Sequence, residues 1–159
     1  MTGGGMMSAQ PGDDRVSGNL VASVDDRLGL ALTAASRAME SRYRASLTRL
    51  QLTYSQFQVM SVLWEDGSHI VGALADRLAL DVSTISPLLK RLESRGLVVR
   101  RRDARDERRV VVSLTERGLA LRAEEGAILD EVSVGTHLTA AQERSLVQQL
   151  QRLAKFLGS

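Results

Sequence analysis

Residues 81–96, DVSTISPLLKRLESRG, limit the fold of this chain more than any other stretch, because two stripes of different chemistry share one helical repeat. The apolar stripe, at offsets 0, 3, 4 and 7, consists of Ile85, Leu88, Leu89 and Leu92. The second stripe, at the same offsets on a different face, consists of Ser83, Ser86, Pro87 and Lys90. The pattern predicts a helix that buries leucines on one side and presents hydroxyls and a cation on another.

The two ends of this helix carry different signals. Gly96, directly after Arg95, is typical of a C-terminal cap. At the other end, Ser86–Pro87 alone also fits an N-cap followed by the first helical residue. We place the start near Ser83 instead, with Pro87 in the opening turns of the helix.

Residues 100–112, RRRDARDERRVVV, hold six arginines and three acids and end in a run of valines. The flanking β-branched runs, 97–101 and 109–114, predict two strands that form a hairpin with a charged turn. Asp106 and Arg108 are two residues apart, so on a strand-like backbone their side chains share one face. A carboxylate at that place can hold the guanidinium in a defined geometry. Taken alone, the charge run also fits a merely solvated turn.

Three helical segments precede this region in the sequence. Residues 25–50 contain no proline and carry an apolar stripe, which predicts one long helix. Thr53 and Gln56 fit a capping box that opens a second helix, which runs to about Trp64. A short helix is expected over residues 70–80.

Two more helices are expected after the hairpin. Thr115 fits the N-cap of the first, and a capping box at Thr139–Gln142 opens the second. A leucine seam on the last helix consists of Leu146, Leu150, Leu153 and Leu157. The expected fold is mainly α with a small β-hairpin wing. It comprises a disordered tail over 1–19 and a single domain over 20–159, with a winged helix-turn-helix at 53–116 and dimerisation helices at 25–50 and 116–157.

The basic side chains are concentrated in the middle of the chain. Residues 71–116 carry 10 basic and 7 acidic side chains, whereas residues 1–70 carry 6 and 7, and residues 117–159 carry 5 of each. This distribution is expected for a module that binds a polyanion between neutral helices. Arginine accounts for 19 of the 21 basic residues, and genome composition explains that choice but not the location.

The composition also excludes several classes of function. The sequence has no cysteine, which excludes disulfides, thiol catalysis and thiolate metal sites, and fits a cytoplasmic protein. No secretory signal and no apolar run of about 20 residues is found. Phosphate loops, nucleophile elbows and paired-histidine motifs are missing, so we expect neither an enzyme nor a cofactor or metal ion.

A helix with a polar outer face followed by a basic hairpin suits duplex DNA. The helix fits the major groove, and the hairpin tip reaches the adjacent minor groove, whose negative potential attracts a guanidinium. We expect DNA contacts from ten residues: Ser83, Thr84, Ser86, Pro87, Lys90, Arg91, Arg101, Arg105, Asp106 and Arg108. The alternative is a winged-helix module that binds protein and does not bind DNA.

The stretch LDVSTISPLLKRLESRGLVVRRRDARDERRVVVSLTERG (80–118) resembles the core of the MarR family of bacterial transcriptional regulators. Residues 52–65 and 28–47 resemble the organic-hydroperoxide-sensing (OhrR) branch of that family. The resemblance implies a homodimer held by terminal helices, a pseudo-palindromic operator and Arg108 in the minor groove. It also implies a repressor that a small effector releases from DNA.

One difference from that branch is informative. Its reactive cysteine lies in the first helix, where this chain has Gly29, and Thr33 replaces a tyrosine that partners the thiolate. Without a thiol, peroxide oxidation cannot begin there, so we reject thiol-based sensing. Gly29 and Thr33 leave room that could admit a small organic effector. The candidate effector pocket consists of Gly29, Thr33, Tyr43, Phe57 and Trp64, although the three aromatic residues also fit a core role.

Overall fold

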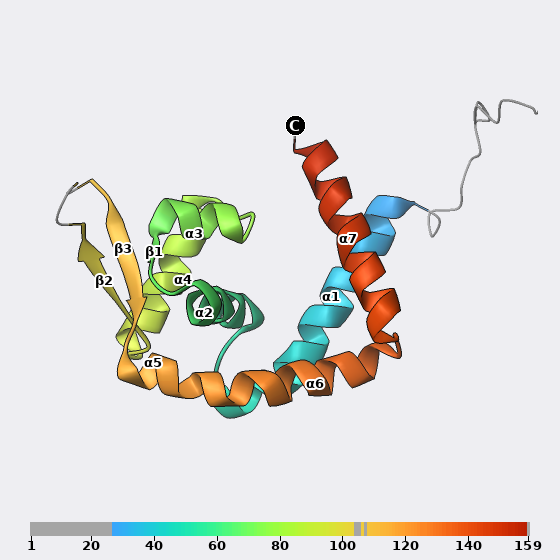
Figure 1. Ribbon diagram of the computed structural model, residues 1–159, viewed down its shortest axis with the longest axis horizontal. Helices are drawn as coiled ribbons and strands as arrows, with labels where there is room; N and C mark the ends of the chain where they lie inside the picture. Colours follow the sequence, from blue (N-terminus) through green and yellow to red (C-terminus); the bar gives the residue numbers. More distant parts are fainter. Residues whose placement is uncertain (1–26, 104–105, 107, 159) are drawn as a thin grey trace, which may run out of the picture. The chain divides into compact units, whose positions relative to one another are not determined.

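A computed structural model describes residues 27–103, 106 and 108–158. The tail expected over 1–19 and the predicted DNA contact Arg105 lie outside these residues. The chain divides into two compact units between Ala35 and Ser36. Its elements in chain order are α1 (Leu28–Leu47), η2 (Thr48–Leu50), α2 (Tyr54–Asp66), β1 (His69–Ile70), α3 (Val71–Arg77), α4 (Val82–Ser94), β2 (Val98–Arg102), β3 (Val110–Leu114), α5 (Glu116–Ala120), η3 (Leu121–Glu124), α6 (Glu125–Thr136) and α7 (Ala140–Leu157) (Figure 1).

Local signals in the sequence explain where three of the helices begin. Thr53 accepts a hydrogen bond from the Gln56 backbone N–H, and the Gln56 side chain accepts one from the Thr53 N–H, which completes the capping box of α2. Thr139 and Gln142 form the same arrangement at the start of α7. Thr115 accepts from the Gly118 N–H and caps α5. All three predicted caps are confirmed.

Helix α4 begins at Val82, so the alternative start at Ser86–Pro87 is wrong. Pro87 lies inside the helix, where it has no N–H to donate to the Ser83 carbonyl. The end of the helix is a Schellman motif. The Gly96 N–H donates to the Glu93 carbonyl and the Leu97 N–H donates to the Leu92 carbonyl, while Gly96 has a φ of +68°. This turn reverses the chain and starts β2 beside the end of α4.

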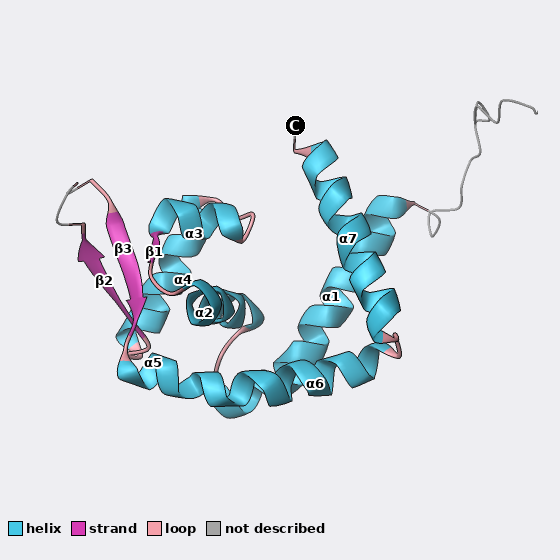
Figure 2. Cartoon of the chain, viewed as in Figure 1, coloured by secondary structure: helices cyan, strands magenta, loops and turns pink. Residues whose placement is uncertain are grey.

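The two predicted strands form a three-stranded antiparallel sheet together with a short strand that the sequence did not suggest (Figure 2). In the order β1-β3-β2, Arg100 pairs with Val112 and Arg102 with Val110, whereas β1 pairs with β3 only at His69↔Val112 and Ile70↔Val111. The hairpin therefore extends beyond β1 toward its charged turn.

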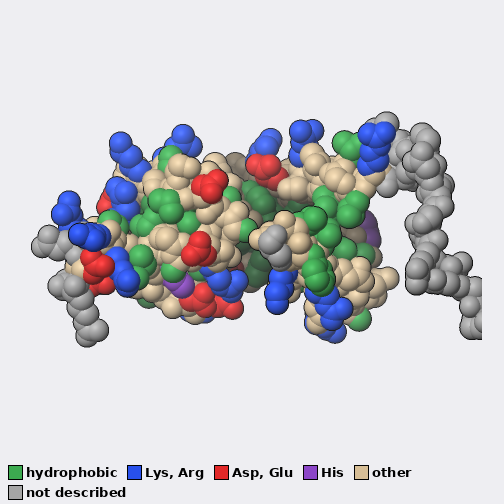
Figure 3. All heavy atoms as spheres, turned by 90° about the horizontal axis from the view of Figure 1, so that it is seen from above, with side chains coloured by type: hydrophobic (Ala, Val, Ile, Leu, Met, Phe, Trp, Pro, Cys, Tyr) green, Lys and Arg blue, Asp and Glu red, His purple; other side chains and the backbone are tan. Residues whose placement is uncertain are grey.

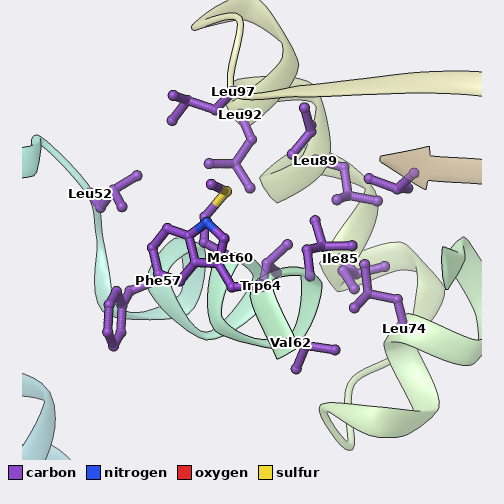
Figure 4. Close-up of a cluster of buried hydrophobic side chains, with 14 of the residues drawn as sticks. Leu52, Phe57, Met60, Val62, Trp64, Leu74, Ile85, Leu89, Leu92 and Leu97 are labelled. Carbon is purple, nitrogen blue, oxygen red and sulfur yellow. The ribbon is translucent and has the colours of Figure 1, made fainter. Parts of the chain in front are cut away.

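The core joins α2 to α4 and to the hairpin. Figure 4 shows Met60 and Trp64 of α2 directed toward Leu92 and Leu97. Along α4, Ile85, Leu89 and Leu92 are all 0% exposed, which confirms the predicted apolar face. Leu88 is only half-buried. The apolar stripe thus fixes α4 on α2 and leaves the hydroxyl-bearing face outward.

The junction between the core and α5 requires a glycine. The Trp64 indole Nε1 donates to the Gly118 carbonyl at 2.9 Å, in a buried position. A Cβ at Gly118 would overlap the Leu97 carbonyl oxygen and lie 3.3 Å from Leu114 Cδ2. Gly118 therefore permits the close approach of α5 to the turn between α4 and β2.

The segment after Thr115 was expected as one helix. The structure instead has α5, a 3-10 turn (η3) and α6, which follow one another along one path in Figure 1. Helix α7 contains no buried residue. On its predicted leucine seam, Leu146, Leu150 and Leu157 are 45%, 39% and 74% exposed. Across the part of the chain that the structure describes, no helix combines the length and apolarity needed to span a bilayer.

The close approach at Gly118 yields a stability prediction. Gly118→Ala should destabilise the fold by about 1–3 kcal/mol, because the methyl group meets backbone that cannot move aside easily. Gly126→Ala in α6 is the matched control, since a Cβ there meets no atom within 4 Å. It should be neutral or stabilising by about 0.4–1 kcal/mol. Urea unfolding at one fixed protein concentration measures both, and equal effects would contradict the close approach.

Candidate nucleic-acid interface

Helix α4 presents five of the ten predicted contact residues on its solvent side. Ser83, Thr84, Pro87, Lys90 and Arg91 are all exposed. Ser86 is half-buried, and its hydroxyl donates to the Val82 carbonyl at 2.7 Å. That bond uses the only proton of the hydroxyl, so Ser86 is left as an acceptor toward an incoming donor.

The hairpin places further arginines near its turn. Arg101 on β2 is exposed, and Arg108 and Arg109 directly precede β3. Figure 3 shows Lys and Arg side chains gathered around the hairpin, with Asp and Glu side chains among them. Arg109 was not among the predicted contact residues, although it is next to Arg108 in the same basic run.

The expected pairing of Asp106 with the Arg108 guanidinium is wrong for the described atoms of this turn. Asp106 Oδ2 lies 3.2 Å from Arg109 Nε, and Asp106 Oδ1 accepts from the Arg108 backbone N–H at 3.1 Å. The Arg109 N–H also donates to the Asp106 carbonyl. The reason is that these residues form a tight turn and not a strand, so the two-residue alternation of side chains does not apply.

A hollow of about 330 Å³ separates α4 from the outer part of the hairpin. It brings together two predicted residues, Ser86 and Arg108, with two that the sequence reasoning did not select, Arg100 and Arg109. The full lining consists of Ile70, Val71, Gly72, Val82, Ser86, Leu89, Arg100, Arg108, Arg109 and Val110. Lys90, Arg91 and Arg101 are not part of this lining.

One ion pair connects α4 to the hairpin. Glu93, in the last turn of α4, accepts hydrogen bonds from Arg100 Nε at 2.8 Å, Arg100 Nη2 at 2.5 Å and the Arg100 backbone N–H at 3.2 Å. The hydrogen bonds from Arg100 hold the pKa of the Glu93 carboxyl below its ordinary value of 4.5. The positive charge of Arg100 is therefore paired with a carboxylate of the same chain.

A second arginine ties the end of α4 to the segment before α2. Arg95 Nη1 donates to the Gln51 carbonyl at 2.6 Å, and Arg95 Nη2 donates to the Leu50 carbonyl at 2.9 Å. The carbonyl of Arg95 in turn accepts from Arg117 of α5. The C-terminal end of α4 is thus fixed from two sides, and both ties use carbonyls that the helices and turns leave unpaired.

The residues of the candidate effector pocket have other structural roles. Phe57 and Trp64 are each 3% exposed and meet edge to face at 6.0 Å, as core residues do. Tyr43 is half-buried and stacks on Tyr54 with ring centroids 4.6 Å apart, and burial raises the pKa of the Tyr43 phenol above its ordinary value. Separately, in the first unit, the Thr33 hydroxyl donates to the Gly29 carbonyl at 2.8 Å.

Metal ligands do not gather in the part of the chain that the structure describes. Among the residues for which positions are described, no group of three or more His, Cys, Asp or Glu side chains could hold a metal ion. His69 lies 3.5 Å from Asp66, and this is an ion pair only when the imidazole is protonated.

Comparisons with known proteins assign the family. The sequence pattern of the MarR family matches residues 52–110. The chain is 40% identical over 128 residues to the HTH-type transcriptional regulator TtmR of Methylorubrum extorquens (strain PA1), and 39% identical over 99 residues to the organic hydroperoxide resistance transcriptional regulator of Bacillus subtilis (strain 168). These matches cover 80% and 62% of this chain, and 66% and 67% of the relatives. The chain belongs to the MarR family.

Solved structures of MarR-type regulators have the same fold. Reduced AbfR bound to DNA matches with a TM-score of 0.69 and 28% identity, over 82% of this chain and 90% of AbfR. BpsR of Bordetella bronchiseptica, whose DNA binding is regulated by 6-hydroxynicotinic acid, matches with a TM-score of 0.74 and 25% identity. That match covers 82% of this chain and 95% of BpsR. The expected MarR resemblance and the winged-helix fold class are confirmed.

The lowered pKa of Glu93 gives a pH prediction with a definite sign. A carboxyl whose pKa is depressed by folding contributes stability that is complete above its unfolded value and is lost as pH falls through its folded value. The difference in unfolding free energy between wild type and Glu93→Gln should therefore be largest at neutral pH and shrink below the ordinary value of 4.5. Urea titrations at several pH values measure this difference, and a pH-independent difference would contradict the ion pair.

Proposed function

We propose that this MarR-family chain is a sequence-specific regulator of transcription that binds duplex DNA, with α4 in the major groove and the β2–β3 hairpin as the wing. The observation that carries the proposal is the arrangement of α4. Its leucine face is buried in the core, its opposite face carries exposed hydroxyls and cations, and Ser86 lines a hollow together with Arg108 and Arg109 of the hairpin. A negative phosphate backbone suits this basic surface.

The proposed DNA contacts remain those of the sequence, Asp106 included, with one addition. Ser83, Thr84, Ser86 and Pro87 would face base edges or the backbone, and Lys90 and Arg91 would reach phosphates. Arg101, Arg105 and Arg108 would act from the wing, with Arg109, held by Asp106, added to them. Of the two ways to read the charge run, DNA contact is favoured over a solvated turn.

The functional unit would be a homodimer, most often a repressor in this family. The exposed leucine seam of α7, which the chain does not cover within its own described residues, supports an intermolecular contact. We keep the division into a winged helix-turn-helix at 53–116 and dimerisation helices at 25–50 and 116–157. Two copies would present two α4 helices about 34–36 Å apart. This distance is one helical turn of DNA and matches the two halves of a pseudo-palindromic operator.

A small organic effector would release the DNA by changing that separation. BpsR, which responds to 6-hydroxynicotinic acid, supports an effector of this chemical class. Gly29, Thr33, Tyr43, Phe57 and Trp64 stay our candidates, with Tyr43 the most accessible of the three aromatics. The absence of cysteine still excludes thiol-based sensing. Because its target is DNA, we place the protein in the cytoplasm.

Two other classes of function are less well supported. The relatives are named as transcriptional regulators, in agreement with the expectation that the chain is not an enzyme. A module that binds only protein would have no need of the basic hairpin beside the hydroxyl-bearing face of α4.

Footprinting on the upstream region of the protein's own gene tests the proposal directly. A protected pseudo-palindrome is expected, and affinity should fall with a log–log salt slope of about 0.9 per phosphate neutralised. If no genomic fragment is bound at low ionic strength, the protein is not a DNA-binding regulator.

The wing is tested by Arg108→Ala. Binding to the duplex should weaken by about 1–3 kcal/mol, because the substitution removes the guanidinium from the minor groove, and the dimer should stay intact. Arg122→Ala on η3 is the matched control, because it removes another exposed arginine that lies outside the proposed interface. Fluorescence anisotropy at moderate salt measures both variants, and equal affinities for the two would exclude Arg108 from the interface.

The seam is tested by Leu150→Glu. A charge in the seam should yield monomers in sedimentation and abolish tight operator binding, because a single reading head makes half of the contacts. Gln148→Glu, on the opposite side of α7, adds the same charge and should leave the dimer unchanged. A wild-type protein that sediments as a monomer would overturn the dimer.

A further inference from the structure

The ion pair between Glu93 and Arg100 has no role among the DNA contacts proposed above. Its two residues are only seven apart in sequence, but they lie on different elements, the last turn of α4 and the third residue of β2. The charged groups of Glu93 and Arg100 are both partly shielded, with side chains 34% and 32% exposed. Glu93 accepts three hydrogen bonds, one of them from the backbone N–H of Arg100, so the strand is held as well as the side chain.

The position of this ion pair matters because few other contacts hold the outer part of the hairpin. Val98 at its base and Val112, which pairs with Arg100, are buried in the core. Strand β1 pairs with β3 only at Val111 and Val112. Beyond Arg100, the hairpin and α4 are separated by the hollow that Ser86 and Arg108 line.

The charge at Glu93 is also unexpected for a surface that binds DNA. A carboxylate on the reading helix repels phosphates, and pairing with Arg100 removes one guanidinium from the basic hairpin. Electrostatics alone would favour a neutral side chain at this place. A geometric role explains why an acid is there, because a carboxylate can take two guanidinium N–H groups and a backbone N–H together.

We infer that Glu93 is a positioning residue for the wing: it holds Arg100, and thereby sets the reach of the hairpin tip relative to α4. Arg100 is then a structural arginine and makes no DNA contact. The inference rests on the proposed DNA binding, since a position of the wing has a consequence only if the wing meets a ligand.

Glu93→Gln tests the inference through the sign of its effect. The variant removes a negative charge from the interface, so an electrostatic role predicts tighter binding to the operator duplex. A positioning role predicts weaker binding, by about tenfold, near the lower end of the effect expected for removing one base-reading arginine. Asp76→Asn, an exposed acid on α3, is the control for the same charge change and should bind as wild type or tighter. Equal or tighter binding by Glu93→Gln would overturn the inference.

A double-mutant cycle separates positioning from a general loss of structure. Because Glu93 acts through the wing, its substitution should cost little further affinity in an Arg108→Ala background. Additive effects of the two substitutions would overturn the inference. Limited trypsin digestion gives an independent readout, since Glu93→Gln should be cut faster within residues 101–109 and at an unchanged rate elsewhere.

Arg100→Lys keeps the result decisive if Glu93→Gln does not fold. Lysine retains the charge but cannot reproduce the two guanidinium bonds, so a charge role predicts unchanged binding and a positioning role predicts weaker binding at an unchanged salt slope. If wild-type protein binds no duplex, the proposed function itself fails. If wild-type protein binds the duplex and the variants bind it equally well, the proposed function stands and only the positioning role fails.

Discussion

Burial of the leucine face of α4 is the interaction on which the rest of the structure depends. Ile85, Leu89 and Leu92 are completely shielded against α2 and the hairpin, and each such side chain is worth about 2–5 kcal/mol relative to alanine. Because one face of the helix is committed to the core, the opposite face must point outward. The same thirteen-residue helix therefore supplies both the face buried in the core and the face proposed to contact DNA.

Contacts at the C-terminal end of α4 hold the helix against the hairpin and against the segment before α2. The left-handed Gly96 turns the chain back so that β2 starts beside the helix it has just left, and Glu93 and Arg100 meet as a result. On the other side, Arg95 joins the same helix end to the segment that leads out of α1. Helix, hairpin and preceding segment are thus held together by three charged side chains within eight residues of sequence, Glu93, Arg95 and Arg100.

Much of this could be predicted from the sequence, because periodicity and capping are local. The buried face of α4, three threonine caps and both hairpin strands follow from short patterns. Strand β1 was missed because two residues carry no periodicity, and η3 because its composition is helical. The partner of Asp106 was wrong because a turn was treated as a strand. Glu93–Arg100 requires the chain reversal at Gly96, and no spacing rule indicates that an acid and an arginine seven apart will meet.

The exposed apolar side chains of α7 would make the activity of the protein depend on its concentration in the cell. No residue of α7 is buried by the described part of its own chain, so in the proposed dimer its apolar side chains would gain their contacts from the second subunit, and the cellular concentration of the protein would affect its activity. At low abundance the population of paired chains grows with the square of the subunit concentration. Promoter occupancy would then rise more steeply than synthesis, and modest changes in expression or turnover would act as a threshold without any metabolite.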